Sequence, residues 1–405
     1  MTDLSLVSLA DIEAARELLA GVARTTPLES SRALADRVGG PVHLKCENLQ
    51  RTGSFKIRGA YVRIARLSEE QRSHGVVAAS AGNHAQGVAL AAALLGCDAT
   101  VFMPTGAPIP KIEATKAYGA EVRTAGSTVD EALQAAAAFA EQTQAVLIHP
   151  FNHPDVIAGQ GTVGLEVLEQ CPDVRTVVVG AGGGGLVSGI AVAVKALRPD
   201  VEVVAVQAAG AAAFPASLAA GSPVALTSMA TMADGIAVGC PGELTLRHVS
   251  DLVDRVVTVD DDALSRALLL GLERAKLVVE PAGAAGLAAV MEDPTAFAPP
   301  VVVVLSGGNI DPLLLSKVIR QGLAAAGRFL SLSVRIPDRP GELALLLGVL
   351  GESGANLLDV EHKRTGKELH VDEVEVDLQV ETRGSEHSDA VVEALQRSSY
   401  PVRRS

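Results

Sequence analysis

HLKCENLQRTGSFKIRGAY, residues 43–61 of this 405-residue chain, contains the lysine around which the sequence is organised. Lys56 stands between two apolar residues, three positions after Gly53 and two positions before Arg58. Partial burial and a nearby cation both disfavour the charged form of a lysine amine and so lower its pKa. A lysine whose amine is neutral near physiological pH can form a Schiff base with a carbonyl group. Lys56 is therefore a candidate for covalent chemistry, although the ordinary interpretation of a lysine is a solvated surface charge.

The composition is that of a globular protein with two or three domains. Hydrophobic residues make up 48% and charged residues 20% of the chain, which excludes a largely disordered polymer. A formal net charge of -13 argues against a nucleic acid or an anionic membrane as partner, because both attract basic surfaces. The four cysteines are scattered without a C-x-x-C pair, so we expect neither a zinc site nor a disulfide framework. The first residues carry early acids and no long apolar run, so we expect no signal peptide and a cytoplasmic protein.

Short apolar runs alternate with helical stretches over most of the chain. Strands are expected at residues 42–45, 75–80, 99–103, 121–124, 145–148, 175–179, 201–207, 256–259 and 300–305. Such alternation predicts parallel sheets covered by helices, and the number of strands suits two α/β domains. Residues 177–194 contain no charge and approach the length of a membrane span, but Gly182–Gly185 would break such a helix. That stretch is therefore predicted to be a strand, a loop and a helix.

After residue 326 the pattern changes to alternating apolar and polar residues. This period of two is typical of strands with one buried and one exposed face. The expected elements are, in order, strand 330–336, helix 343–350, strand 357–361, strand 374–380, helix 389–396 and strand 400–402. The order βαββαβ is typical of a small ferredoxin-like domain.

Three of the expected strands end in loops of small residues: Ser80–His84, Gly180–Gly185 and Ser306–Asn309. Ligands of open parallel sheets bind outside the carboxyl ends of the strands, so these loops together with Lys56 predict one binding site. The four consecutive glycines of the second loop precede an expected helix and leave backbone N–H groups free for a phosphate. The same loop fits the G-x-G-x-x-G pattern of dinucleotide sites. The next strand, however, ends in Gln207 instead of the acid that would hold a ribose.

KCENLQRTGSFKIRGA, residues 45–60, resembles the cofactor-lysine segment of pyridoxal-phosphate enzymes of fold type II, and it is most similar to the threonine and serine dehydratases. The resemblance extends in order over nearly the whole chain. It implies pyridoxal 5'-phosphate as cofactor and a catalytic domain at 1–326, with a smaller α/β subdomain at roughly 47–150 inserted into the larger one. PDRPGEL at 337–343 and SGANLLDV at 353–360 resemble ACT domains, which implies a regulatory domain at 328–405.

The resemblance also implies roles for individual residues. Lys56 would hold the cofactor and act as the catalytic base. The residues implied in cofactor binding are Lys56, Phe55, Asn83, Gly182, Gly183, Gly184, Gly185, Leu186 and Ser306, with the glycines and Leu186 at the phosphate, Asn83 at the ring hydroxyl and Ser306 at the ring nitrogen. The residues implied in binding the substrate carboxylate are Ser80, Ala81, Gly82, Asn83 and His84. Glu280 would lie near the ring, although an acid before a proline at a helix start is an equally good interpretation.

These features together predict the dehydration and deamination of L-threonine to 2-oxobutanoate and ammonia. L-serine differs by one methyl group, so a serine dehydratase stays open, as does a non-catalytic amino-acid sensor of the same fold. Racemase activity is not expected, because Ala81 stands where family racemases carry a second serine. No metal is expected, because Gln207 and Ala213 stand where some relatives hold a divalent cation with acids.

The C-terminal domain is expected to regulate the enzyme and to pair with other copies. The resemblance to ACT domains implies an effector site at the turn after its first strand and the following helix start, with Asp338, Arg339 and Gly341, joined by Asn356. A helix start favours an anionic group, so an amino acid such as isoleucine or valine, or a nucleotide such as AMP, would fit. We therefore expect an amino-acid substrate, a small-molecule effector and a homo-oligomer, dimer or tetramer, without nucleic-acid or membrane partners.

Overall fold

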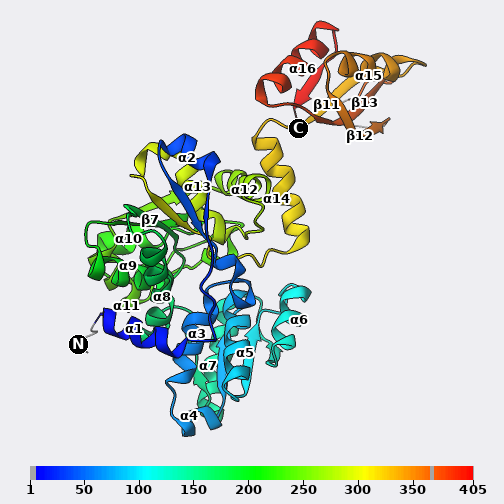
Figure 1. Cartoon of the computed structure of the whole chain (residues 1–405). Coiled ribbons are helices and arrows are strands. Elements are labelled where there is room, and N and C mark those ends of the chain that lie inside the picture. The colour runs from blue at the N-terminus through cyan, green and yellow to red at the C-terminus, as the bar shows by residue number, and fades with distance from the viewer. Residues whose placement is uncertain (1–5, 365–368, 405) are drawn as a thin grey trace. The chain divides into compact units, whose positions relative to one another are not determined.

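The structure is a computed structural model that describes residues 6–364 and 369–404. The chain forms two compact units, Met1–Pro312 and Leu313–Ser405 (Figure 1). The described residues of the first unit form two sheets, and those of the second form one. The sequence analysis set the boundary at 326–328, after the expected helix. The division into units assigns that helix, α14 (Pro312–Ala325), almost entirely to the second unit.

The larger sheet of the first unit has six strands in the order β1-β2-β10-β7-β8-β9. Their bounds are Leu28–Ser30 (β1), Val42–Lys45 (β2), Val301–Val304 (β10), Thr176–Gly180 (β7), Glu202–Ala208 (β8) and Arg255–Val259 (β9). Neighbouring strands pair in parallel except β1, which runs antiparallel at one edge and was not predicted. β10 consists of four buried valines, as expected of a parallel strand covered on both faces.

The smaller sheet has four parallel strands in the order β5-β4-β3-β6. Their bounds are Glu121–Thr124 (β5), Ala99–Met103 (β4), Val76–Ala79 (β3) and Val146–Leu147 (β6). The chain leaves the larger sheet after β2, builds the smaller sheet and returns at β7, so the smaller sheet is an insertion into the larger one. The predicted class of two parallel-sheet α/β domains is therefore confirmed.

Helices of the first unit pack on both sheets. Their bounds are Leu9–Leu18 (α1), Arg32–Val38 (α2), Lys56–Ala65 (α3), Glu69–Ser73 (α4), Asn83–Leu94 (α5), Ile109–Ala117 (α6), Val129–Thr143 (α7), Pro154–Gln170 (α8), Gly185–Leu197 (α9), Phe214–Ala220 (α10), Glu243–Leu252 (α11), Asp261–Leu270 (α12) and Ala285–Glu292 (α13). α8 and α9 bury Val163, Val187 and Ile190 against Val203 and Val304 of the larger sheet. The uncharged stretch 177–194 is thus a strand, a glycine loop and a buried helix, as predicted.

The second unit has an antiparallel sheet in the order β12-β13-β11-β14. Its elements are β11 (Phe329–Pro337), α15 (Glu342–Glu352), β12 (Asn356–Lys363), β13 (Glu373–Glu381), α16 (Ser385–Arg397) and β14 (Val402–Arg404). The predicted order βαββαβ is therefore observed, with β11 and β13 in the centre as in ferredoxin-like domains. Alternate residues of β11, beginning with Leu330 and Leu332, form a core with Leu346 of α15 and Leu395 of α16.

A buried network of two cations and two anions joins β2, α3 and α8 in the first unit. Arg58, two residues after Lys56, donates to both oxygens of Glu47 at 2.8 Å and to Oε1 of Glu166 at 2.7 Å. Lys45 at the end of β2 donates to Oε2 of Glu166 at 2.5 Å and to the carbonyl oxygen of Thr26 at 2.8 Å. Burial alone would raise the pKa of Glu47, but the charge and hydrogen bonds of Arg58 outweigh it and hold the pKa below its usual value.

Arg58→Met should destabilise the protein by about 3–5 kcal/mol, because Glu47 and Glu166 would stay buried without their cation. The midpoint of urea unfolding measures this loss. Arg266→Met is the matched control, because Arg266 pairs with Glu292 in a solvent-exposed position. That variant should lose less than about 1 kcal/mol. Equal losses for the two variants would show that the buried network does not hold α3 in place.

Candidate active site

Lys56 is the first residue of α3, and its side chain is partly buried. The amine Nζ donates to the carbonyl oxygen of Pro150 at 2.9 Å and lies 5.1 Å from the centroid of the Phe55 ring. Burial lowers the pKa of Lys56 to about 8, and the charge of Glu280 opposes this shift only in part. From the sequence, the charge of Arg58 was expected to help lower the pKa of Lys56. That expectation was wrong, because two buried glutamates neutralise Arg58.

The loop Ser306–Asn309 lies directly against the turn before Lys56. The Phe55 N–H donates to the carbonyl oxygen of Ser306 at 3.2 Å, and the Gly308 N–H donates to the carbonyl oxygen of Gly53 at 2.9 Å. Ser54 and Gly307 form a β-bridge between these two pairs. Backbone hydrogen bonds therefore fix where Lys56 stands relative to the strand end that carries Ser306.

The glycine loop carries backbone N–H groups that have no acceptor among the described residues. Gly184 has a φ of +91° and precedes the first residue of α9, a conformation that favours glycine. Among the described residues, nothing accepts a hydrogen bond from the N–H groups of Gly182–Leu186. A Cβ atom on Gly183 would lie 2.3 Å from the ring of Phe151, the residue after Pro150. The loop with these unpaired donors therefore contacts Phe151, the neighbour in sequence of the residue whose carbonyl accepts from Lys56, and N–H groups at a helix start are suited to an anion.

Asn83 and Glu280 form a hydrogen-bonded pair, and the charge of Glu280 acts on Lys56. Nδ2 of Asn83, the first residue of α5, donates to Oε1 of Glu280 at 2.5 Å. Burial, and then the charge of Asp234, raise the pKa of Glu280 to about 7, although the hydrogen bond from Asn83 opposes them. Gly307 lies against this pair, because a Cβ there would come within 2.3 Å of Oε1 of Glu280. Glu280 can therefore be neutral or ionised near physiological pH.

Pairwise contacts link these features into one closed chain of neighbours. The glycine at 182 lies against the backbone of Ile236, and Gly235 lies 3.7 Å from Oε1 of Glu280, measured from the position of a Cβ atom. In order, these neighbours are Lys56, Pro150, Phe151, Gly183, Gly182, Ile236, Gly235, Glu280, Asn83, Asn309 and Thr52. The structure thus brings the predicted Lys56, Phe55, Asn83, Ser306 and Gly182–Leu186 together.

The predicted carboxylate-binding segment precedes α5. Ser80, Ala81 and Gly82 form the loop, and Oγ of Ser80 accepts a hydrogen bond from the Gly82 N–H at 3.1 Å. The His84 side chain is buried and donates from Nε2 to the carbonyl oxygen of Ile148 at 2.8 Å, so it is engaged away from the loop. Burial lowers the pKa of His84 to about 3 and that of His149, a neighbour of Pro150, to about 4. Both histidines are therefore neutral.

Two contacts of the site were missed by the sequence analysis. Asn309 was named only as a loop residue, yet its amide contacts both Asn83 and Thr52. Its place in the third strand-end loop was a signal that could have identified it. Lys111 of α6 pairs with Asp234 at 2.6 Å, and a Cβ on Gly82 would lie 4.0 Å from its amine. No motif marked Lys111, because it comes from a helix without a strand-end loop.

The predicted effector residues divide into two groups. Asp338, Arg339 and Gly341 form the turn between β11 and α15, where Gly341 has a φ of +95° and Asp338 pairs with Arg364 at 3.5 Å. Asn356 lies opposite Glu381, whereas the turn follows Pro337, which lies opposite Glu373. Eight positions of strand separate 373 from 381, or roughly 27 Å. One copy of the chain therefore does not bring Asn356 to the turn.

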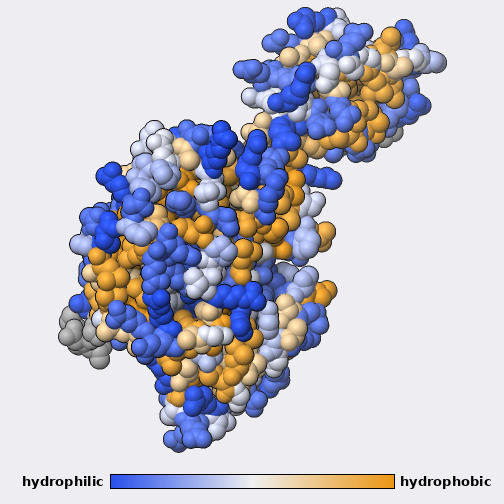
Figure 2. Space-filling view, viewed as in Figure 1, coloured by the Kyte–Doolittle hydropathy of each residue, from blue (hydrophilic) through white to orange (hydrophobic). Residues whose placement is uncertain are grey.

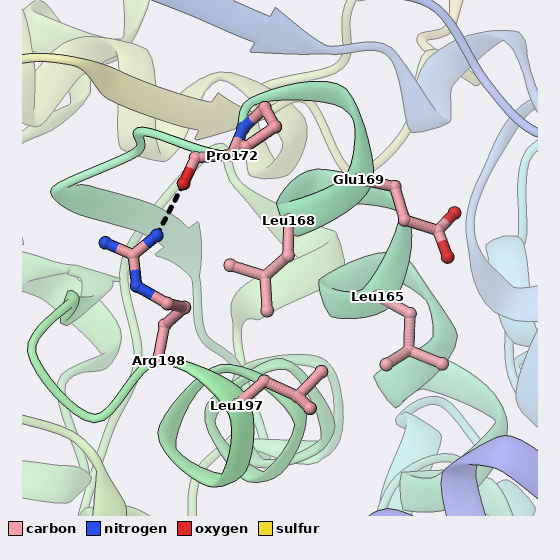
Figure 3. A pocket seen from close by; sticks show the side chains of 6 residues that line it. All are labelled: Leu165, Leu168, Glu169, Pro172, Leu197 and Arg198. Atoms are coloured by element: carbon pink, nitrogen blue, oxygen red, sulfur yellow. Dashed lines mark hydrogen bonds between the residues drawn. The ribbon is translucent and has the colours of Figure 1, made fainter.

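A separate surface pocket lies between the ends of α8 and α9 (Figure 3). Its lining residues are Leu165, Leu168, Glu169, Pro172, Leu197 and Arg198. Leu197 is the last residue of α9 and lies roughly 18 Å along the helix from the glycine loop. The pocket shares no residue with the candidate site.

The described residues contain no cluster of metal-ligating side chains and no helix long and apolar enough to cross a membrane. The side chain of Gln207, where some relatives were expected to carry an acid, is buried and accepts a hydrogen bond from the Phe214 N–H at 2.9 Å.

Comparison with known proteins agrees with this geometry. A family described as pyridoxal-phosphate dependent enzyme matches residues 19–307. The L-threonine ammonia-lyase of Thermotoga maritima is 47% identical over 398 residues, which cover 98% of this chain and 99% of that protein.

The chain is also similar to solved structures. A maize serine racemase matches with a TM-score of 0.74 and 40% identity, over 79% of this chain and 99% of its own. The processed form of a threonine deaminase from Solanum lycopersicum matches with a TM-score of 0.74 and 39% identity, over 79% of this chain and 87% of its own.

Glu280→Gln should make the cofactor-free protein more stable above about pH 7 and leave it unchanged below about pH 4.5. A pKa raised from 4.5 to about 7 in the folded state means that the wild type loses stability as pH rises through this window. The difference should approach roughly 3 kcal/mol, while glutamine can still accept the Asn83 hydrogen bond. Urea unfolding at about pH 4.5 and about pH 8 tests this. Glu13→Gln, on the exposed face of α1, is the control, and a pH-independent difference for Glu280→Gln would contradict the expectation.

Proposed function

Because this chain belongs to the family of pyridoxal-phosphate dependent enzymes, we propose that it converts L-threonine to 2-oxobutanoate and ammonia. The observation that carries the proposal is Lys56, whose pKa is lowered to about 8 and whose amine donates to Pro150, the residue before the Phe151 that contacts the glycine loop. The near full-length likeness to an L-threonine ammonia-lyase supports threonine as the substrate.

The residues of the site fit pyridoxal phosphate. The free N–H groups of Gly182–Leu186 suit its phosphate, the amine of Lys56, with its lowered pKa, suits its aldehyde, and Nδ2 of Asn83 suits its ring oxygen. When bound, pyridoxal phosphate supplies an aromatic ring that stabilises negative charge at the substrate α-carbon. Oγ of Ser306 makes no hydrogen bond among the described residues and would face the ring nitrogen. Unlike a carboxylate, a hydroxyl there would not keep the ring nitrogen protonated, so the ring would be a weaker electron sink. A weaker sink suits elimination better than transamination, because the leaving β-hydroxyl takes up the electrons.

Lys56 has the second task of removing the α-proton of the substrate. A base with a pKa near 8 is partly neutral at physiological pH and can both take up and return a proton. The loop Ser80–Asn83 offers hydroxyl and N–H donors at the start of α5 for the substrate carboxylate. Loss of the β-hydroxyl as water leaves an enamine, which tautomerises and is hydrolysed to the 2-oxo acid and ammonia.

Two alternatives receive less support. The likeness to a maize serine racemase would suggest racemisation, but Ala81 has no hydroxyl to deliver a proton to the opposite face of the α-carbon. A non-catalytic amino-acid sensor would not need a lysine with a lowered pKa beside an anion site. L-serine stays open as a second substrate, because one methyl group changes binding by only about 1–3 kcal/mol.

Lys56→Ala should remove the violet absorption of the bound cofactor and lower threonine turnover by at least about 10³-fold, because the lysine is both anchor and base. Absorption spectra and the yield of 2-oxobutanoate measure the two effects. Lys276→Ala is the control, since that lysine is exposed and bonds only to a carbonyl oxygen of its own turn. Turnover at the wild-type rate in Lys56→Ala would refute the proposed mechanism.

The second unit acts, we further propose, as an ACT domain that pairs with a second copy and binds an amino acid or a nucleotide. β12 is an edge strand, and Leu358 and Val360 on it are exposed, as is Leu345 of α15. Figure 2 shows hydrophobic residues at the surface of this unit. An exposed apolar edge favours pairing with another strand. Such pairing supports a homo-oligomer. The four free thiols support a cytoplasmic location, since thiols stay reduced there.

Pairing through β12 would also resolve the separation of the effector residues. In an antiparallel pair centred on residues 359 and 360, Asn356 of one copy lies opposite Lys363 of the other. Lys363 lies opposite Glu375, two residues from the partner of Pro337, so Asn356 would approach the Asp338–Gly341 turn of the second copy. The effector pocket would then require two copies.

Val360→Lys should therefore weaken self-association and abolish any response to isoleucine, valine or AMP, while threonine turnover without effector persists. The added charge opposes pairing at the strand edge. Val371→Lys is the matched control, because Val371 is exposed in the same unit but lies outside the strands. Sedimentation and turnover with each effector are the measurements. A wild-type protein that responds to none of these compounds would reduce the second unit to a structural role.

A further inference from the structure

The side chain of Asn309 links the turn before Lys56 to Asn83. Its Nδ2 donates to the carbonyl oxygen of Thr52 at 2.6 Å and to Oδ1 of Asn83 at 2.8 Å. We propose that Asn309 is a positioning residue that holds the Asn83 amide in one orientation. In that orientation the NH₂ group of Asn83 faces Glu280 and the cofactor, and Asn83 acts towards both as a donor only. The inference rests on the proposed function, because it concerns the cofactor oxygen that Asn83 would contact.

The carbonyl oxygen of Thr52 determines the orientation of the Asn309 amide. The two ends of an amide have nearly the same shape, so neighbours decide which end points where. A backbone carbonyl can only accept, and the carbonyl of Thr52 therefore requires the NH₂ end of Asn309. Thr52 and Gly53 both have positive φ, 63° and 69°, and the former is uncommon for a β-branched residue. A Cβ on Gly53 would lie 2.3 Å from Oδ1 of Asn309, so this turn is shaped to seat the asparagine.

The orientation of the Asn309 amide determines that of the Asn83 amide. With one hydrogen of Nδ2 on Thr52, the other points to Asn83, whose oxygen must face it to accept. A reversed Asn83 would place two NH₂ groups against each other. The oxygen of Asn83 is therefore held towards Asn309, and its NH₂ group towards Glu280. The orientation thus originates in a backbone carbonyl, a group that cannot change its role.

The orientation of Asn83 also determines which ligand atom it can contact. Nδ2 of Asn83 has two hydrogens, and among the described residues only Glu280 accepts one of them. The second is left for the ligand, so the ligand atom there must be an acceptor. For pyridoxal phosphate this atom is the ring 3-oxygen, and a fixed donor favours its anionic form. The direction of the Asn83 amide would thus keep the bound cofactor in one protonation state over the physiological pH range.

The test compares Asn309→Asp with Asn48→Asp in the cofactor-loaded protein. Asn48 is buried, donates from Nδ2 to the carbonyl oxygen of Val278 at 3.0 Å and packs against Gly308. Both variants exchange an NH₂ group for an oxygen and lose a bond to a backbone carbonyl, but only Asn309 contacts Asn83. A merely structural role predicts lower melting temperatures in both variants and unchanged spectra in both.

We expect Asn309→Asp to shift cofactor absorption from the violet to the near ultraviolet and to make the ratio of the two bands vary between about pH 6 and about pH 9. Cofactor affinity should fall about tenfold, as expected for loss of one favourable hydrogen bond. Asn83→Asp should reproduce the spectral shift, because it places an acceptor on the ligand side. Asn48→Asp should keep the wild-type spectrum at every pH. Should Asn309→Asp fail to fold, Asn309→Ala removes the same donor and should give the same shift.

The outcomes separate this inference from the proposed function. A wild-type protein without violet absorption after incubation with pyridoxal phosphate would overturn both. A wild-type protein with that absorption, unchanged by Asn309→Asp or Asn309→Ala, would overturn the role of Asn309 alone. Equal spectral changes in the Asn309 and Asn48 variants would also overturn the role of Asn309. They would show that any acid near the loop Ser306–Asn309 changes the spectrum.

Discussion

The neutralisation of Arg58 is the constraint on which the site depends. An arginine keeps its charge even when it is buried, so the structure must bring anions to it. Glu47 and Glu166 come from the segment after β2 and from α8, and Lys45 balances the second of them. Each would be costly to bury alone, so the network forms complete or not at all. It fixes the start of α3 relative to β2 of the larger sheet and to α8, and Lys56 is the first residue of α3.

Much of the fold could be predicted from the sequence because its signals are local. Apolar runs and glycine loops marked the parallel strands, and the alternation in residues 330–336 marked an antiparallel one. β1 was missed because three residues, two of them exposed, carry no pattern. The partners of Arg58 were missed for a different reason. Glu166 lies 108 positions away, and nothing in one sequence tells which distant charge a residue will meet.

In the candidate site, too, local features could be predicted from the sequence and long-range contacts could not. The three loops at strand ends were recognisable, since parallel strands bring their carboxyl ends to one edge. What each residue contacts was not, because side-chain direction depends on packing. His84 turned out to bond to Ile148, Asn309 to Asn83, and Asn356 lies at the far end of its sheet from the turn it was grouped with. Residue type and spacing predicted which residues belong to the site, whereas only the structure shows which side chains contact one another.

The two histidines beside Lys56 have a consequence for enzymology. Histidine is the usual explanation for activity that changes between pH 5 and 8, since its ordinary pKa falls there. Burial lowers the pKa of His84 to about 3 and that of His149 to about 4, so both are already neutral throughout that range. Glu280 and Lys56, with pKa values near 7 and 8, titrate within or close to it. A change in the rate of this enzyme between pH 5 and 8 should therefore not be assigned to these two histidines, contrary to the usual assignment.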